Sequence, residues 1–371
     1  MNGPTVTFNF RHVQTICVAC TVATLPAAAT AMRPGPSAPT PQSVSAATES
    51  AEVYLQTGWD RLNGGDFEAA AAAFRRAVQL KPDLATGHLG LGLSLANLHR
   101  YLEAVECFER SIALRPDVAS AYMNLGLAFE RIGRHDDAIV ACHRALSLKP
   151  DDADAYYCVG WASSGLRRWT DAIDAFGHVV AARRGDVAAH LGIGIASSNL
   201  GRYASAIDAF TEALTLNPDL AEAHLALGSI YGNLDRWNEA LQNLQRAVAL
   251  APDNREAHYN LAKALARNGR PEDALEQYRH TVLLAPADAE AHFHLGLTLV
   301  DLHRTSEAVT AFSEAVRLRP GYAAAMFNLA LAYNALGRTR DAWDVQRTLI
   351  PIEPNLSRQL ELLLGKERGS P

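Results

Sequence analysis

The chain lacks a basic excess, and it lacks apolar runs long enough to cross a membrane. Its 371 residues carry 34 basic and 40 acidic side chains, which gives a net charge of −6. Nucleic-acid binding draws on a surplus of Lys and Arg to neutralise phosphates, so this balance argues against nucleic acid as the main partner. The apolar run from Val13 to Leu25 is shorter than the roughly 20 residues of a spanning helix. We expect no membrane span in the mature chain.

Motifs for catalysis and cofactor binding are also missing. Gly90 and Gly92 are followed by neither the further glycine nor the lysine that a phosphate-binding loop requires. The chain contains no His-Glu-x-x-His sequence and no Cys/His cluster with zinc spacing. We therefore predict that the protein is not an enzyme, and that it holds no cofactor and no metal.

Cysteine is scarce, with five residues in the whole chain. Cys107, Cys142 and Cys158 lie after the first 31 residues, and three is an odd number. Their spacing fits neither a metal site nor a disulfide framework. We predict that all three are small, buried apolar side chains.

What the chain does contain is a repeated unit, represented by Ala221–Asn254. Its second half places Ala240, Leu244 and Ala247 on one apolar stripe at helical period, and Pro252 ends that helix. Its first half has a similar stripe. Two such short amphipathic helices leave an apolar face uncovered, so the unit needs copies of itself on either side.

The copies follow at a step of 34 residues from Ala51 to Leu356, which makes nine units that start at 51, 85, 119, 153, 187, 221, 255, 289 and 323. Each unit except the fourth has proline at one fixed place: Pro82, Pro116, Pro150, Pro218, Pro252, Pro286, Pro320 and Pro354. All nine have alanine twelve residues earlier, and glycine or alanine twelve residues before that. Small residues at two fixed places let paired helices approach closely.

This unit resembles the tetratricopeptide repeat, a helix-turn-helix of the same length. The family pattern stands here as Tyr122, Leu125, Gly126, Phe129, Ala138, Cys142 and Pro150. The resemblance implies an all-α, right-handed α-solenoid of bacterial type, in which the first helix of each pair lines a concave groove.

The ends of the chain differ from the repeats. Residues 1–31 resemble a secretory signal peptide, with an apolar run and a small-x-small site at Ala29-Thr30-Ala31. This predicts export to the periplasm or beyond; cytoplasmic location with a misplaced start codon, and lipidation at Cys20, are alternatives. Residues 32–50 read as a Pro/Ala/Ser-rich linker. Residues 355–365 read as a capping helix, with Leu356, Leu360, Leu363 and Leu364 on one face, and residues 366–371 as a polar tail.

Three local features of the repeats have structural interpretations. Asp219 followed by Glu222, and Asp253 followed by Glu256, fit capping boxes at the starts of two first helices. Glycines in the turn between paired helices predict left-handed backbone, and His99, Arg167, Asp235 and His303 should be strained in the same place. The fourth repeat lacks the proline and carries Gly177 within its second helix, which leaves both a hinge and ordinary drift open.

Two columns of polar residues are interpreted as structural. His88, His190, His224, His258 and His292 share one repeat position, but packed helices lie too far apart for parallel side chains to share a metal ion. We predict that they pack between helices. The turn arginines, such as Arg134 and Arg236, either form a basic binding stripe or pair with the acids at the next helix start, and we favour pairing.

The resemblance implies that the groove carries the function. The residues expected there form an apolar and aromatic wall with an acidic rim, and include asparagines that would form hydrogen bonds with a peptide backbone. The candidate peptide-binding residues are Met123, Asn124, Tyr157, Trp161, Leu191, Leu225, Glu222, Glu256, Tyr259, Asn260, Lys263, Glu290, Phe293, Phe327 and Asn328. Relatives that grip acidic C-termini use a Lys/Asn clamp, which Tyr259, His294 and Ala324 do not match.

We therefore predict a non-catalytic scaffold that binds an extended apolar or basic segment of another protein. The alternative is an accessory or targeting subunit of a separate enzyme or envelope-assembly complex, such as a protein glycosyltransferase or a pilus or secretion machine. The sequence leaves the partner's identity and the oligomeric state open.

Overall fold

The 34-residue period appears in three dimensions as a regular series of helices. A computed structural model describes residues 50–366, and this part of the chain contains nineteen α-helices and no strand. The predicted signal peptide, almost all of the predicted linker and the polar tail beyond residue 366 lie outside the described residues. The all-α solenoid class is confirmed. Two compact units divide the chain between Leu216 and Asn217.

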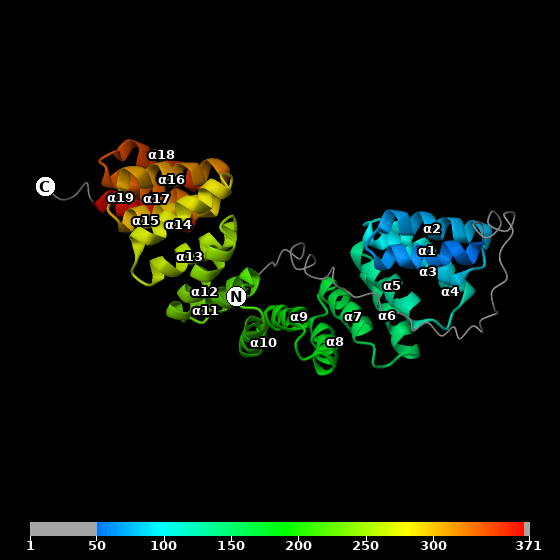
Figure 1. The fold of residues 1–371 in the computed structure, drawn as a ribbon. Helices are drawn as coiled ribbons and strands as arrows, with labels where there is room; N and C mark the ends of the chain where they lie inside the picture. Colours follow the sequence, from blue (N-terminus) through cyan, green and yellow to red (C-terminus); the bar gives the residue numbers. More distant parts are fainter. Residues whose placement is uncertain (1–49, 367–371) are drawn as a thin grey trace, which may run out of the picture. The chain divides into compact units, whose positions relative to one another are not determined.

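The first unit contains five helix pairs, which run from blue to green in Figure 1. They are α1 (Ala51–Asn63) with α2 (Phe67–Leu80), α3 (Ala85–Asn97) with α4 (Tyr101–Leu114), α5 (Ala119–Arg131) with α6 (His135–Leu148), α7 (Ala153–Gly165) with α8 (Trp169–Ala182), and α9 (Val187–Asn199) with α10 (Tyr203–Leu216).

The second unit contains four pairs and one further helix, which continue to red in Figure 1. They are α11 (Ala221–Asn233) with α12 (Trp237–Leu250), α13 (Arg255–Arg267) with α14 (Pro271–Leu284), α15 (Ala289–Asp301) with α16 (Thr305–Leu318), α17 (Ala323–Ala335) with α18 (Thr339–Leu349), and α19 (Pro354–Lys366). In both units, each odd-numbered helix from α1 to α17 is the first helix of its repeat.

In most repeats a buried aromatic ring holds the two helices of a pair together, and in some it also contacts the next pair. Phe74 of α2 is fully buried, and a Cβ atom placed on Gly58 of α1 would lie 2.6 Å from its Cε1 atom. A Cβ atom on Gly90, in the first helix of the next repeat, would also overlap the Phe74 ring. Phe176 sits in the same way between Gly160 and Gly192. Glycine is needed at these positions because the ring occupies the space of a side chain.

The turns between paired helices adopt the left-handed conformation that the glycines predict. Gly133 has φ 80°, and the non-glycine residues at this position are confirmed as strained, with φ 57° at Arg167 and 60° at His99. Residues other than glycine rarely adopt this backbone conformation, and each one lowers the free energy of unfolding by about 1 kcal/mol.

The predicted capping boxes are wrong by one residue. The N-cap of α13 is Asn254 rather than Asp253, and its side chain accepts a hydrogen bond from the Ala257 backbone N–H. The N-cap of α11 is Leu220, and Asp219 instead pairs with Arg246. The Asp–x–x–Glu spacing is present, but the helix begins one residue later, so Glu222 and Glu256 do not close the box.

The prediction for Cys142 and Cys158 is also wrong, because these two residues form a disulfide with a Cα–Cα separation of 6.4 Å. Cys142 lies on α6 at the position of Phe74, and Cys158 lies on α7 at the position of Gly90. Both side chains are fully buried. The spacing rules for disulfide frameworks failed here because the repeat register, rather than the linear spacing, brings the two positions together.

The final helix covers the end of the second unit. Leu360 and Leu364 of α19 are buried and pack in one cluster with Met326 of α17 and Leu349 of α18. Leu363, which the sequence placed on the same face, is 40% exposed. None of the helices within residues 50–366 has the length and apolar character needed to cross a membrane.

Candidate functional site: the first helices

The fifteen candidate residues all lie on first helices, and they divide between the two units. Met123, Asn124, Tyr157, Trp161 and Leu191 belong to the first unit, and the others belong to the second. The first-helix face of the second unit is defined here by Glu222, Glu256, Tyr259, Asn260, Lys263, Glu290, Phe293, Phe327 and Asn328. It carries most of the candidates and all of the predicted acidic rim.

Direct hydrogen bonds tie successive first helices together in this unit. The Tyr259 hydroxyl of α13 donates to Glu290 Oε1 of α15 over 3.0 Å. On the other side of α13, Asn260 Nδ2 donates to Ser229 Oγ of α11, also over 3.0 Å. Consecutive first helices are therefore close enough for one extended segment to contact both.

An aromatic cluster backs the centre of this face. Tyr259 packs edge-on against Tyr278, with ring centroids 5.9 Å apart, and His294 lies parallel to the Tyr278 ring at the same distance. Phe293 contacts Phe312 at 5.9 Å. Tyr278 and Phe312 come from second helices, so the wall of the face rests on the buried rings that join the repeats.

Sequence reasoning missed Tyr278, His294 and Tyr322 as members of this cluster. Tyr322 lies 5.0 Å from Phe293 between ring centroids, and Arg319 stacks over it at 4.7 Å. The repeat period could have placed His294 on this face, because it lies 34 residues from both Asn260 and Asn328, which were candidates.

The charges on this face are separated along α13. Burial raises the pKa of the Glu256 carboxyl, and the neighbouring Arg255 opposes this shift only in part. Arg255 itself forms an ion pair with Asp288. Lys263 is exposed two turns further along α13. The first turn of α13 therefore carries a partly desolvated carboxylate that favours a nearby cation, and a lysine lies further along the same helix.

Burial also perturbs the two ring groups at the centre of the cluster. It lowers the pKa of the His294 imidazole and raises the pKa of the Tyr259 hydroxyl, which the Glu290 carboxylate raises further. At neutral pH both rings are uncharged, so this part of the face presents neutral aromatic surface.

The three candidate asparagines have their amide donors engaged within the chain. Asn124 Nδ2 donates to the Ser120 carbonyl and Asn328 Nδ2 donates to the Ala324 carbonyl, each at 2.7–2.8 Å. Asn260 uses its donor on Ser229, as described. Each amide keeps a second N–H, which would donate to a peptide carbonyl, and its side-chain oxygen, which would accept from a backbone N–H.

Several candidates contribute little accessible surface. Leu191, Leu225 and Tyr157 are only 1%, 6% and 7% exposed. Met123 and Trp161 are partly exposed, and Trp161 packs edge-on against Phe176 at 5.1 Å. Phe327 packs with the cluster under α19. The buried members act as support for their neighbours rather than as contact surface.

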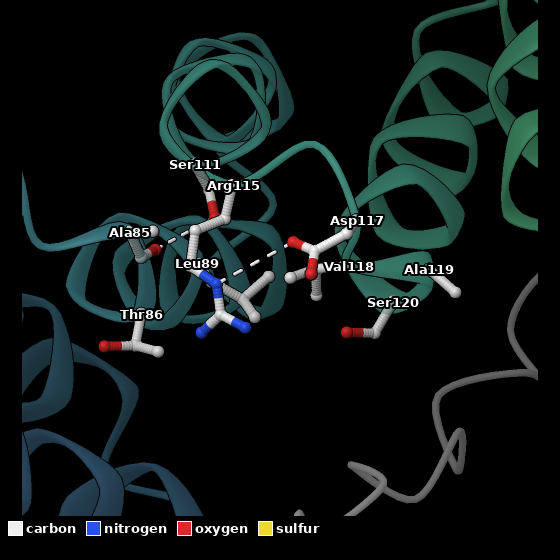
Figure 2. Close-up of a pocket in the computed structure, with 9 residues that line it drawn as sticks. All are labelled: Ala85, Thr86, Leu89, Ser111, Arg115, Asp117, Val118, Ala119 and Ser120. Atoms are coloured by element: carbon white, nitrogen blue, oxygen red, sulfur yellow. Dashed lines mark hydrogen bonds and ion pairs between the residues drawn. The ribbon is translucent and has the colours of Figure 1, made fainter. Parts of the chain in front are cut away.

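A cavity in the first unit lies beside two repeats that have no acid at the position of the rim glutamates. It has a volume of about 360 Å³ and lies between α3, the end of α4 and the start of α5. Figure 2 shows the Arg115 guanidinium between Thr86 and Ser120 at its mouth. Thr86 and Ser120 occupy the repeat position that holds Glu222, Glu256 and Glu290 in the second unit. The two repeats beside the cavity therefore offer a hydroxyl where α11, α13 and α15 offer a carboxylate.

The histidine column makes a specific backbone contact. In each repeat that carries it, Nε2 lies 2.8–3.1 Å from the carbonyl oxygen of the residue six positions earlier, as His88 does with Pro82 and His258 with Pro252. The ring therefore forms a hydrogen bond with the turn that precedes its own helix. Within residues 50–366, no three His, Cys, Asp or Glu side chains gather as they would around a metal ion.

Six of the eight turn arginines pair with the acid three residues later, as predicted. Arg134 contacts Asp137 at 2.7 Å and Arg236 contacts Glu239 at 2.7 Å, and four other repeats form the same pair. Arg134 also stacks over Phe129, at 4.3 Å from the ring centroid. These charges are already neutralised within the turn, which disfavours the basic-stripe interpretation.

Comparison with family models identifies the repeat throughout most of the array. Models described as tetratricopeptide repeat match residues 55–104, 89–153 and 293–356, and residues 255–288. A model described as TPR repeat matches residues 199–235 and 233–269. Together these ranges cover more than half of the chain. No curated protein matches the sequence.

Solved structures of repeat proteins resemble this chain. PilF of Pseudomonas aeruginosa is 18% identical, with a TM-score of 0.51 over 58% of this chain and 98% of its own. YrrB, described as a TPR protein with an unusual peptide-binding site, is 23% identical, with a TM-score of 0.48 over 51% of this chain and 98% of its own. A tetratricopeptide repeat protein from Parabacteroides merdae is 16% identical, with a TM-score of 0.49 over 67% and 98%. The likeness to PilF shows the fold alone.

Proposed function

This chain belongs to the tetratricopeptide repeat family, and from that premise we propose that it is a non-catalytic scaffold whose second unit binds an extended apolar or basic segment of another protein. The segment lies in a concave groove along the first-helix face. Tetratricopeptide repeats serve as protein-interaction modules, and the fold supports that general role.

The observation that carries the proposal is the pairing of a neutral aromatic surface with a partly desolvated carboxylate. Tyr259 and Phe293 supply large rings that remain partly exposed. Glu256 stands one turn before Tyr259, and burial raises its pKa. A lysine or arginine placed here would restore the lost solvation of the carboxylate, and an adjacent apolar residue would cover the rings.

The spacing of the first helices suits an extended segment. Packed helices lie 8–10 Å apart, and an extended chain advances about 3.3 Å per residue, so about three residues pass from one helix to the next. The side-chain oxygens of Asn260 and Asn328 would accept hydrogen bonds from backbone N–H groups along the way. An acidic segment is disfavoured because it would face Glu222, Glu256 and Glu290.

Binding of labelled peptides measured by fluorescence anisotropy tests this proposal. We expect a peptide with lysines and aromatic residues to bind, and its acidic counterpart, with glutamate in place of lysine, to bind at least roughly tenfold more weakly. Added salt should weaken the first interaction. Preferential binding of the acidic peptide would contradict the proposal.

Variants of the face separate its two components. Tyr259→Ala with Phe293→Ala should weaken binding by roughly tenfold or more, since aromatic anchors dominate such surfaces. Glu256→Gln with Glu290→Gln removes charge without opening a cavity, and should weaken the basic peptide while sparing an uncharged aromatic one. Leu283→Ala is a matched control, because Leu283 is 74% exposed on the second helix α14. If the control loses as much affinity as the face variants, the face is wrongly assigned.

A further inference from the structure

A recurring pair of positions, sixteen residues apart, joins the second helix of one repeat to the first helix of the next. In two places the pair is a buried phenylalanine against a glycine: Phe74 with Gly90, and Phe176 with Gly192. The large ring fills the junction, and the glycine makes room for it. Tyr278 with His294 is another form of the same pair, in which the two rings stack.

The junction between the third and fourth repeats is filled differently. Cys142 and Cys158 occupy the same two positions, and both are small. A cysteine side chain ends at one sulfur where phenylalanine carries a whole ring, so two separate thiols would leave the space underfilled. The covalent bond links α6 to α7 at this place instead.

The surroundings of the pair fit this arrangement. Gly126 of α5 lies against both sulfurs, and a Cβ atom there would overlap Cys142 Sγ, just as a Cβ atom on Gly58 would overlap Phe74. The two helices that the bond joins, α6 and α7, contact each other about as extensively as α2 and α3 or α8 and α9, which carry the ring. The bond therefore takes the structural place of the ring.

We propose that Cys142–Cys158 is a structural disulfide, and that the protein accordingly works in an oxidising compartment. Disulfides of this kind form and persist outside the reducing cytoplasm. The signal peptide predicted from residues 1–31 would bring the chain there, but the disulfide supports the same location independently. The inference holds whether or not the first-helix face binds a peptide.

Formation of the bond is a thiol–disulfide exchange. Two cysteine thiols lose two protons and two electrons to a disulfide-donor oxidoreductase, whose own disulfide is reduced to a dithiol, and the Cys142–Cys158 bond forms. The exchange takes place before the junction closes, since both sulfurs are fully buried in the folded chain. The same burial protects the finished bond from reductants, so the bond is a stable structural cross-link.

The remaining cysteine of the described chain does not compete for this pairing. Cys107 is half-buried, and burial raises the pKa of its thiol to about 11. The thiolate is the reactive form, so Cys107 is a poor nucleophile at neutral pH. One disulfide and one inert thiol are therefore expected among these three residues.

Trapping the thiols in the source cells tests the proposal directly. Cells are quenched in acid, free thiols are alkylated under denaturing conditions, and the full-length protein is digested without reductant for mass spectrometry. We expect a cross-linked peptide that joins Cys142 to Cys158, with alkylation at Cys107. If Cys142 and Cys158 are alkylated instead, the proposal is overturned.

Variants test whether the bond replaces the ring. Reductant present during unfolding and refolding should lower the Tm of the wild type by roughly 5–10 °C, as expected for the loss of a bond that closes a short loop. Cys142→Phe with Cys158→Gly recreates the pair found at Phe176 and Gly192, and its Tm should not respond to reductant. Cys107→Ser should respond like the wild type. If reductant does not change the Tm of the wild type, or does not change that of Cys107→Ser, the structural role of the Cys142–Cys158 disulfide is ruled out.

Discussion

Replacing Gly177 by alanine should stabilise the fourth repeat. Gly177 lies inside α8, it is exposed, and no atom lies within 4 Å of the place that a Cβ would take. Its backbone is absent from the positive-φ residues of the described chain, so alanine fits without strain. Glycine inside a helix costs about 1 kcal/mol relative to alanine. Gly177→Ala should therefore raise the unfolding free energy by about 1 kcal/mol, which corresponds to roughly 2–4 °C in Tm for a unit of this size.

A second glycine in the same repeat provides the opposite case. A Cβ on Gly160 would lie 2.6–2.8 Å from three ring atoms of Phe176, well inside the 3.5–4.0 Å of favourable carbon contact. The ring cannot move aside easily, because it is fully buried and Tyr157 and Trp161 pack against its edges. Overpacking of a core costs about 1–3 kcal/mol, so it should outweigh the helical gain. Gly160→Ala should lower the unfolding free energy by about 1–2 kcal/mol.

Thermal unfolding followed by circular dichroism measures both changes, and hydrogen exchange of the α7 and α8 amides assigns them to this repeat. A repeat array need not unfold in one step, so the exchange data are the more direct readout. If Gly177→Ala gains nothing, the glycine serves a bend, and the hinge interpretation of the fourth repeat is favoured over drift. If Gly160→Ala stabilises as much as Gly177→Ala, the ring does not lock the repeats as described.

Two further predictions concern charge and backbone. Burial raises the folded-state pKa of Glu256, so the protonated carboxyl favours the folded state and the ionised carboxylate opposes it. The contribution of Glu256 to the free energy of unfolding is therefore fully present at low pH, and it is lost as the pH rises through the folded-state pKa. Glu256→Gln should therefore raise the Tm at pH 7, with a gain that vanishes below about pH 4, the ordinary glutamate range, while it weakens binding of a basic peptide. A gain that persists at low pH would show another cause. Arg167 has φ 57°, so Arg167→Gly should relieve backbone strain and raise the free energy of unfolding, measured by chemical denaturation, by about 1 kcal/mol. Gly133→Ala should lower it by a similar amount. If both variants change the free energy of unfolding in the same direction, this reasoning is wrong.

The fold was largely readable from the sequence because each repeat supports the same interpretation. The helices begin and end at regular places, and the turn residues have the backbone that their position predicted, down to His99 and Arg167. The helix starts were harder to place. Asp253 and Asn254 are both good N-caps, and only the structure shows that Asn254 takes the role.

The candidate site was less predictable, since the repeat pattern gives the face of a helix but not the exposure of each residue on it. Leu225 and Tyr259 share one repeat position, but Leu225 is buried and Tyr259 is partly exposed. The neighbouring side chains decide the difference. The disulfide was missed for a related reason: Cys142 and Cys158 are unremarkable in linear spacing, and become partners only when both are read as junction positions of the repeat.

The contact between each column histidine and the turn before its helix has a consequence for how a repeat holds together. A carbonyl oxygen can only accept, so the ring nitrogen that faces it donates the hydrogen bond. At His224 and His258 the other ring nitrogen faces a side chain of the second helix in the same repeat, Asn243 of α12 or Gln277 of α14. Each of these two rings therefore connects the entering turn, the first helix and the second helix, and replacing it by alanine should loosen all three parts together.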